Sequence, residues 1–155
     1  MAWDGVERRK RQRERPKVER VMIVEDSEFV AETIKRGLRD VARTIHSTDT
    51  IAGCFYLMGI SSYDYIILDN KLPDGEGTIV APRIKDKSPS TKIILVTSHP
   101  MDDCREMMRG GIIDMVLDKF DDWFFELKER MILKSEIGNV KKILDNTPDF
   151  KMHLA

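Results

Sequence analysis

A short apolar run that stops at a carboxylate constrains this chain more than any other stretch. Residues 65–68 (YIIL) are apolar and contain two adjacent isoleucines, which is typical of a strand buried on both faces. Asp69 follows directly, and the turn pair Asp74-Gly75 comes shortly after it. In an open parallel sheet, the carboxyl ends of the strands form the edge where ligands bind. The pattern therefore predicts that Asp69 lies at a ligand-binding edge.

The same unit recurs along the chain, with mainly apolar runs at residues 21–24, 92–96 and 112–117 and a partly polar strand predicted at residues 41–46, plausibly near an edge of the sheet. Amphipathic segments separate the runs, the first being a Ser27-capped stripe of Val30, Ile34 and Leu38. Strands that alternate with helices predict an α/β fold, a doubly wound, five-stranded parallel sheet with helices on both faces. Its commonest order is the flavodoxin-like 2-1-3-4-5. Further apolar residues indicate the other helices: Ile51, Phe55 and Met58 along one face; Ile79, Val80 and Ile84; Cys104, Met107 and Met108, predicted to face inward; and Phe124, Leu127 and Met131 on one side.

Length and charge indicate one domain with two appendages. A chain of 155 residues can form one domain with a full core but not two ordinary domains. Residues 1–19 are a basic run broken by proline, and we expect a flexible N-terminal arm there. Interspersed glutamates make nucleic acid or anionic lipid a disfavoured partner for this arm. The main domain is predicted over residues 20–134.

Residues 135–155 are predicted to form a helical extension and tail. Ile137, Val140 and Leu144 would lie along one side of its helix. That stripe has to pack on the domain, on a downstream protein or on a second copy, and a second copy would make a homodimer. No apolar run approaches the roughly 20 residues that cross a bilayer, and the start lacks the apolar core of a secretory signal. We therefore expect no membrane span and a cytoplasmic location.

Five side chains of complementary chemistry follow the predicted strand ends: Glu25, Asp26, Asp69, Thr97 and Lys119. Because those ends share one edge, we expect the groups to meet in a shallow cleft. Three carboxylates repel one another unless a cation joins them, and Mg²⁺ suits an open site of oxygen ligands. Asp69 would then accept a phosphoryl group as an acyl phosphate, stabilised by the Thr97 hydroxyl and the Lys119 ammonium. Such a modification acts as a switch.

These residues, with LDNKLPDGEG around Asp69 and VTS around Thr97, resemble the motif set of the receiver domain of bacterial two-component response regulators. The resemblance runs from about residue 21 to residue 134 and implies a flavodoxin-like (CheY-like) fold. It implies that a histidine kinase or a phosphotransfer protein donates the phosphoryl group to Asp69. The absence of sequence for a further output domain favours a stand-alone receiver that signals through protein contact.

The resemblance also implies a ligand set. Asp26 and Asp69 would bind Mg²⁺ with the backbone carbonyl of Lys71, and Glu25 would act chiefly through water. His99 and the Lys71 side chain occupy positions that can influence water attack on the phosphoryl group.

Two departures from the family pattern bear on mechanism. Phe120 follows Lys119 where the family usually has proline, so we predict a trans bond there. Val116 stands where the family commonly carries the aromatic residue that swings inward on activation, so the loop after Thr97 would have to report the change by itself.

Two other functions fit parts of the pattern. A phosphorylation-independent adaptor would keep the fold without the switch. A phosphatase of the haloacid dehalogenase type also uses an aspartyl phosphate, but it needs a second Asp where Lys71 stands. Nucleotide or flavin binding would require a glycine-rich, phosphate-cradling loop. We therefore expect no enzymatic activity beyond self-catalysed phosphorylation and dephosphorylation of Asp69.

Overall fold

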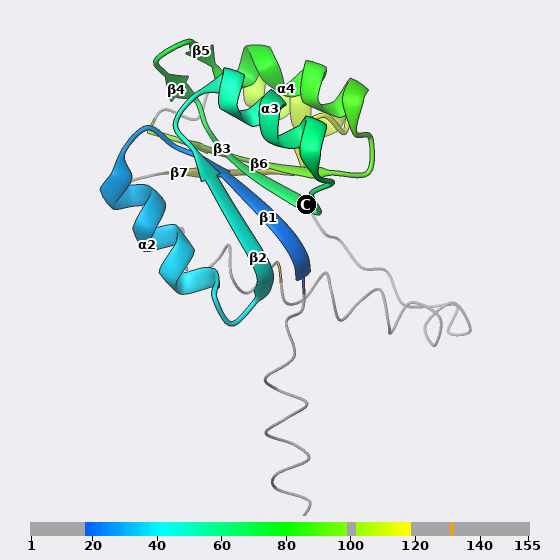
Figure 1. Ribbon diagram of the computed structural model, residues 1–155. Helices are drawn as coiled ribbons and strands as arrows, with labels where there is room; N and C mark the ends of the chain where they lie inside the picture. The colour runs from blue at the N-terminus through cyan, green and yellow to red at the C-terminus, as the bar shows by residue number, and fades with distance from the viewer. Residues whose placement is uncertain (1–17, 99–101, 119–130, 132–155) are drawn as a thin grey trace, which may run out of the picture.

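The computed structural model describes residues 18–98, 102–118 and 131, which form a parallel sheet with helices on both faces (Figure 1). The strands lie in the order β2-β1-β3-β6-β7, so the predicted order 2-1-3-4-5 and the flavodoxin-like fold are confirmed. A small antiparallel pair, β4 and β5, follows the central strand. The elements in chain order are β1 (Val18–Val24), α2 (Glu28–Leu38), β2 (Ala42–Thr48), α3 (Ile51–Ile60), β3 (Tyr65–Asp69), β4 (Lys71–Leu72), β5 (Gly75–Glu76), α4 (Gly77–Lys87), β6 (Lys92–Thr97), α5 (Asp102–Arg109) and β7 (Met115–Asp118).

The first and the last strand of the chain, β1 and β7, do not begin at the predicted residues. β1 begins at Val18, inside the segment predicted as a flexible arm, because Val18 pairs with Ala42 of the edge strand β2. β7 begins at Met115, three residues later than its apolar run suggests. The N–H groups of Ile112 and Ile113 instead bond to the carbonyl of Met107 in α5, at 2.9 and 3.2 Å. The turn that follows α5 therefore takes up the first part of that run.

Local capping sets the start of helix α2. The Ser27 hydroxyl accepts a hydrogen bond from the Val30 N–H at 3.4 Å, as the sequence predicts. Ala31, Ile34 and Leu38 are buried on the inner side of this helix.

Helix α4 buries only some of its apolar residues. Val80, Ala81 and Ile84 define its buried face, whereas the side chain of Ile79 is 70% exposed. The helix itself forms where Ile79, Val80 and Ile84 predict it, and Ile79 is exposed because residues 80, 81 and 84 share one side of a 3.6-residue helix and residue 79 lies off that side.

The sheet separates two hydrophobic clusters. One joins α2 to one face of the sheet and includes the buried Met131. The other joins α3, α4 and α5 to the opposite face, and Cys54 and Cys104 are buried in it, as predicted. Each fully buried large apolar side chain contributes on the order of 2 kcal/mol to stability, so this double core holds the strand ends in fixed positions.

Several predictions fall outside the described residues. They concern the arm before residue 18, the helix after Asp118 apart from Met131, and the C-terminal extension. Among the helices that the structure does describe, none is both long and apolar enough to cross a bilayer.

Candidate functional site

Strand register brings the acidic residues to one place. β1 and β3 are parallel neighbours in which Val24 pairs with Leu68. Glu25 and Asp69 are the next residues on these two strands, so they leave the sheet side by side. Both are 5% exposed, whereas Asp26 is exposed to solvent.

The three carboxylates form a compact cluster. One oxygen from each of Glu25, Asp26 and Asp69 lies within 4.8 Å of the others. The backbone N–H of Ser27 donates to Oε1 of Glu25 at 3.2 Å, which orients this carboxylate. Negative charges at this separation repel strongly where burial lowers the effective dielectric constant. A cluster made only of carboxylate oxygens, open on the Asp26 side, fits a hard cation such as Mg²⁺.

Asn70 anchors the loop that follows strand β3. Its N–H donates to the carbonyl of Val96 at 3.1 Å, and its own carbonyl accepts from the Gly77 N–H at 2.8 Å. Its side-chain oxygen accepts from the Thr78 N–H at 3.1 Å. These bonds close the loop between Asp69 and helix α4. Sequence reasoning missed Asn70, although its place directly after a strand-end carboxylate was a usable signal.

Asp74 joins the same loop to a different helix. Its carboxylate accepts hydrogen bonds from the N–H groups of Ile51 and Ala52, at 2.8 and 3.0 Å, at the start of α3. These two bonds lower the pKa of the Asp74 carboxyl below its ordinary value. The sequence marks Asp74 only as a turn residue, because its partners lie far away in the chain. The loop after Asp69 and helix α3 are therefore linked directly.

Thr97 ends the neighbouring strand β6 and is buried, with Asp118 of β7 as its register partner. Val116 is half-buried and packs against the cluster beneath α3, α4 and α5. Lys71 is exposed in β4. His99, Lys119 and the Lys119-Phe120 bond lie outside the described residues. Of the predicted site residues, the structure thus brings Glu25, Asp26 and Asp69 together and puts Thr97 at the end of an adjacent strand.

Two ionisable side chains outside the acidic cluster, those of Cys54 and His46, have structural roles. Burial raises the pKa of the Cys54 thiol to about 12, so this cysteine is not a reactive thiolate. His46 lies 2.6 Å from the hydroxyl of Tyr63 through its Nδ1 atom, and this pair joins the edge strand to the segment after α3.

The sequence model of one family, described as the response regulator receiver domain, matches residues 21–124. The chain belongs to this family. The match spans every strand of the sheet except the start of β1. Receiver domains are the switch modules of two-component signalling, and the acidic cluster of this one lies inside the matched segment.

Individual relatives agree with the assignment. The transcriptional regulatory protein CutR of Streptomyces coelicolor is 29% identical over 79 residues, which are 51% of this chain and 36% of CutR. The receiver domain is thus similar to only about a third of that relative's length.

Solved structures extend the comparison. The signal receiver domain of a putative LuxO repressor protein from Vibrio parahaemolyticus superimposes with a TM-score of 0.68 at 26% identity, covering 82% of this chain and 97% of that domain. The response regulator TrrA of Thermotoga maritima, solved in complex with Mg²⁺-BeF, gives a TM-score of 0.63 at 27% identity, covering 76% of this chain and 98% of TrrA.

Proposed function

We propose that this receiver domain is a phosphoacceptor signalling switch. Asp69 receives a phosphoryl group from a histidine kinase or a phosphotransfer protein in a Mg²⁺-dependent reaction. The observation that carries the proposal is the meeting of three carboxylates within 4.8 Å at the ends of two paired strands. Asp69 is the member of this cluster that ends the central strand β3, so its position is held by neighbours on both sides.

The cation would be bound by the carboxylates of Asp26 and Asp69 and by the backbone carbonyl of Lys71, with Glu25 acting through water. When bound, Mg²⁺ supplies positive charge that offsets the repulsion between the carboxylates and an incoming phosphoryl group. The donor set is entirely oxygen, which suits this ion. The complex of the related TrrA with Mg²⁺-BeF supports this choice of metal.

In the reaction, a carboxylate oxygen of Asp69 forms a bond to phosphorus as the bond from phosphorus to the donor's imidazole nitrogen breaks. The bonding electron pair leaves with the imidazole, which takes up a proton, and Asp69 becomes an acyl phosphate. The Thr97 hydroxyl then donates a hydrogen bond to a phosphoryl oxygen, and the Lys119 ammonium neutralises the added charge. Hydrolysis of the acyl phosphate restores Asp69 and ends the signal.

The output is contact with a downstream protein. The added dianion changes the hydrogen bonds and charges at the end of β6, and a partner reads the resulting change at the surface. We assign this switch to a domain that begins with β1 at Val18, two residues before the predicted bound at residue 20, and extends to residue 134, with the segments on either side as appendages, in a cytoplasmic protein. His99 and Lys71 are proposed to adjust the rate of hydrolysis, and Val116 leaves the readout without the usual aromatic side chain.

Phosphorylation by acetyl phosphate tests the proposal. With MgCl₂, the wild-type chain should gain the mass of one phosphoryl group, and Asp69→Asn should gain none. Asp64→Asn is a matched control, because Asp64 is an exposed carboxylate at the opposite end of the same strand, and it should be labelled like the wild type. Chelation of Mg²⁺ should abolish labelling. An unlabelled wild type, under conditions that label another receiver domain, would favour a phosphorylation-independent adaptor.

A further inference from the structure

The N-terminal turn of α3 depends on a residue from another segment. The first N–H groups of an α-helix have no partner within the helix and need one elsewhere. The Thr50 hydroxyl accepts the Gly53 N–H at 3.0 Å. The Asp74 carboxylate accepts the N–H groups of Ile51 and Ala52, at 2.8 and 3.0 Å. Because α3 has no acidic residue in its own first turn, the carboxylate that binds these two groups comes from the loop after β3.

The segment that carries Asp74 is a small hairpin rooted at the acidic cluster. Strands β4 and β5 form it, and Asp74 lies in the turn between them, beside the start of α3 (Figure 1). At its base, the carbonyl of Asn70 accepts the Gly77 N–H at 2.8 Å. Asn70 directly follows Asp69 in the chain. Since the hairpin is closed at its base, a restraint applied next to Asp69 also restrains the turn.

A packing contact joins the same hairpin to the same helical turn. A Cβ at Gly75 would lie 2.8 Å from Cδ1 of Ile51, so the hairpin backbone packs against the first side chain of α3. Asp74 holds the N–H of that same residue. The hairpin therefore holds the start of α3 by two different contacts, one polar and one apolar.

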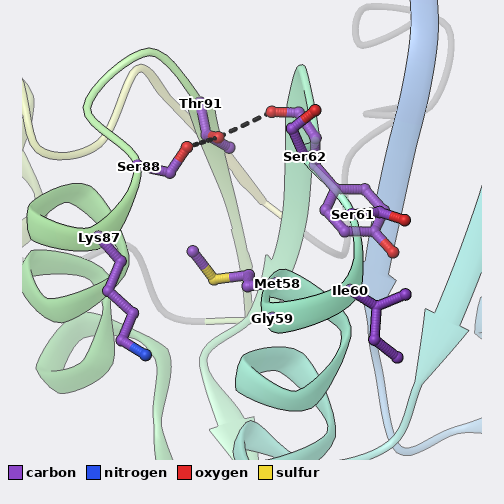
Figure 2. Close-up of a pocket in the computed structure, with 9 residues that line it drawn as sticks. Met58, Gly59, Ile60, Ser61, Ser62, Lys87, Ser88 and Thr91 are labelled. Carbon is purple, nitrogen blue, oxygen red and sulfur yellow. Dashed lines mark hydrogen bonds between the residues drawn. The ribbon is translucent and has the colours of Figure 1, made fainter.

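The rest of α3 is held less firmly. Within α3, whose ten residues the structure describes in full, only Cys54 is buried, whereas Tyr56 and Ile60 are 71% and 65% exposed. Figure 2 shows Met58, Gly59 and Ile60 lining a cavity of about 450 Å³ that separates the end of α3 from the end of α4. Side chains beside a void lack packing partners on that side, and elements with few buried contacts open most readily. The order of α3 thus depends strongly on its N-terminal hold.

We propose that the β4-β5 hairpin couples the acidic cluster to α3, so that a divalent cation in the cluster orders the N-terminal turn of this helix through Asp74. The inference rests on the proposed function, in which Asp69 and the backbone carbonyl of Lys71 bind the same cation. Lys71 belongs to β4, so the hairpin is then fixed at its base. Asp74 consequently releases the N–H groups of α3 less often.

This coupling acts in both directions. If cation binding strengthens the hold of Asp74 on α3, loss of that hold has to weaken cation binding by the same factor. The two effects are measured separately, one at the helix and one at the acidic cluster. A cap that only stabilises α3 would produce neither effect.

Amide hydrogen exchange, followed by NMR on the full chain with and without saturating MgCl₂, tests the proposal. In the wild type, Mg²⁺ should slow exchange of the Ile51 and Ala52 N–H groups about fivefold or more. In Asp74→Ala, their exchange should be faster and should not respond to Mg²⁺. Asp49→Ala is the matched control, because it removes an exposed carboxylate at the same end of α3 that is not a partner of these N–H groups. It should respond to Mg²⁺ like the wild type.

A second variant covers the case in which Asp74→Ala does not fold. Asp74→Asn keeps the shape of the side chain and one acceptor oxygen, so at most one of the two N–H groups should keep its response to Mg²⁺. Calorimetric titration gives the reciprocal measurement. Both Asp74 variants should bind Mg²⁺ more weakly than the wild type, about fivefold or more for Asp74→Ala, whereas Asp49→Ala should bind it like the wild type.

The outcomes separate this inference from the proposed function. A wild type that binds Mg²⁺ with no change in exchange at the start of α3 would overturn the coupling alone, and labelling of Asp69 by acetyl phosphate would still support the switch. Equal slowing in the wild type and in the Asp74 variants would also overturn the coupling. A wild type that binds no Mg²⁺ would overturn both the coupling and the proposed cation site.

Discussion

Gly77 approaches Asp69 so closely that a Cβ at residue 77 would lie 2.7 Å from the backbone carbonyl oxygen of Asp69. The same Cβ would lie 2.9 Å from Cδ1 of Leu95 on the next strand. The first residue of α4 therefore packs directly on the backbone of β3, the strand that ends at Asp69, and only glycine leaves room for this contact. The contact fixes the distance between the acceptor and the helix that follows it.

The variant Gly77→Ala should therefore lower the free energy of unfolding by about 1–3 kcal/mol, the usual cost of forcing an extra methyl group into a packed site. It should also slow phosphorylation by acetyl phosphate, because Asp69 has to shift. Urea unfolding and mass spectrometry measure the two effects. Gly59→Ala is the control: nothing lies within 4 Å of a Cβ at residue 59, so it should raise stability by up to about 1 kcal/mol. Equal effects of both variants would contradict the close contact.

Acidification should remove the contribution of the Asp74 carboxylate to the stability of the folded protein. Its carboxyl has a lowered pKa because it accepts bonds from the N–H groups of Ile51 and Ala52. A lowered folded-state pKa adds stability above the unfolded-state pKa, about 3.9 for Asp, and that stability is lost as the pH falls through the folded-state value. Asp74→Asn should thus be less stable than the wild type near neutral pH, and the difference should shrink below about pH 4.

Thermal unfolding at a series of pH values measures this difference between the two proteins. Asp86→Asn, which changes an exposed carboxylate on α4, provides the comparison for a general charge effect. A gap between wild type and Asp74→Asn that stayed constant down to pH 3 would show that the cap does not depend on ionisation.

The sequence predicts those features that depend on local patterns. Continuous apolar runs and right-handed crossovers predict the strand order. Ser27, as an N-cap residue, predicts where helix α2 begins. The nearness of Glu25 and Asp69 was predictable because each directly follows a strand. The cap from Asp74 was not, since it joins residues more than twenty positions apart. The apolar residues of α4 indicate a helix, but they do not determine which of them is exposed, because Ile79 and Val80 are neighbours that cannot both lie on the buried side.

Removal of one carboxylate should weaken metal binding. Asp26 is the exposed member of the acidic cluster, so Asp26→Asn removes a charged ligand with little effect on the core. We expect Mg²⁺ to bind at least about tenfold more weakly, about 1.4 kcal/mol, in calorimetric titrations. Asp86→Asn, at the far end of α4, should bind Mg²⁺ like the wild type. Unchanged affinity in Asp26→Asn would exclude this carboxylate from the ligand set.

A partly buried ion pair at the opposite end of the sheet should contribute more to stability than a fully exposed pair. Nζ of Lys85 lies 2.9 Å from Oδ2 of Asp114, both side chains are 14% exposed, and this carboxylate oxygen also accepts the Ile93 N–H at 2.8 Å. Asp114→Ala leaves a buried ammonium and a backbone N–H without that partner, so urea unfolding should show a loss of about 3 kcal/mol. Glu19→Ala breaks the exposed pair with Arg43, whose side chains are 71% and 67% exposed, and should cost about 0.5 kcal/mol or less. Similar losses of unfolding free energy in the two variants would mean that the contacts between α4, β6 and β7 stabilise the fold no more than a surface ion pair does.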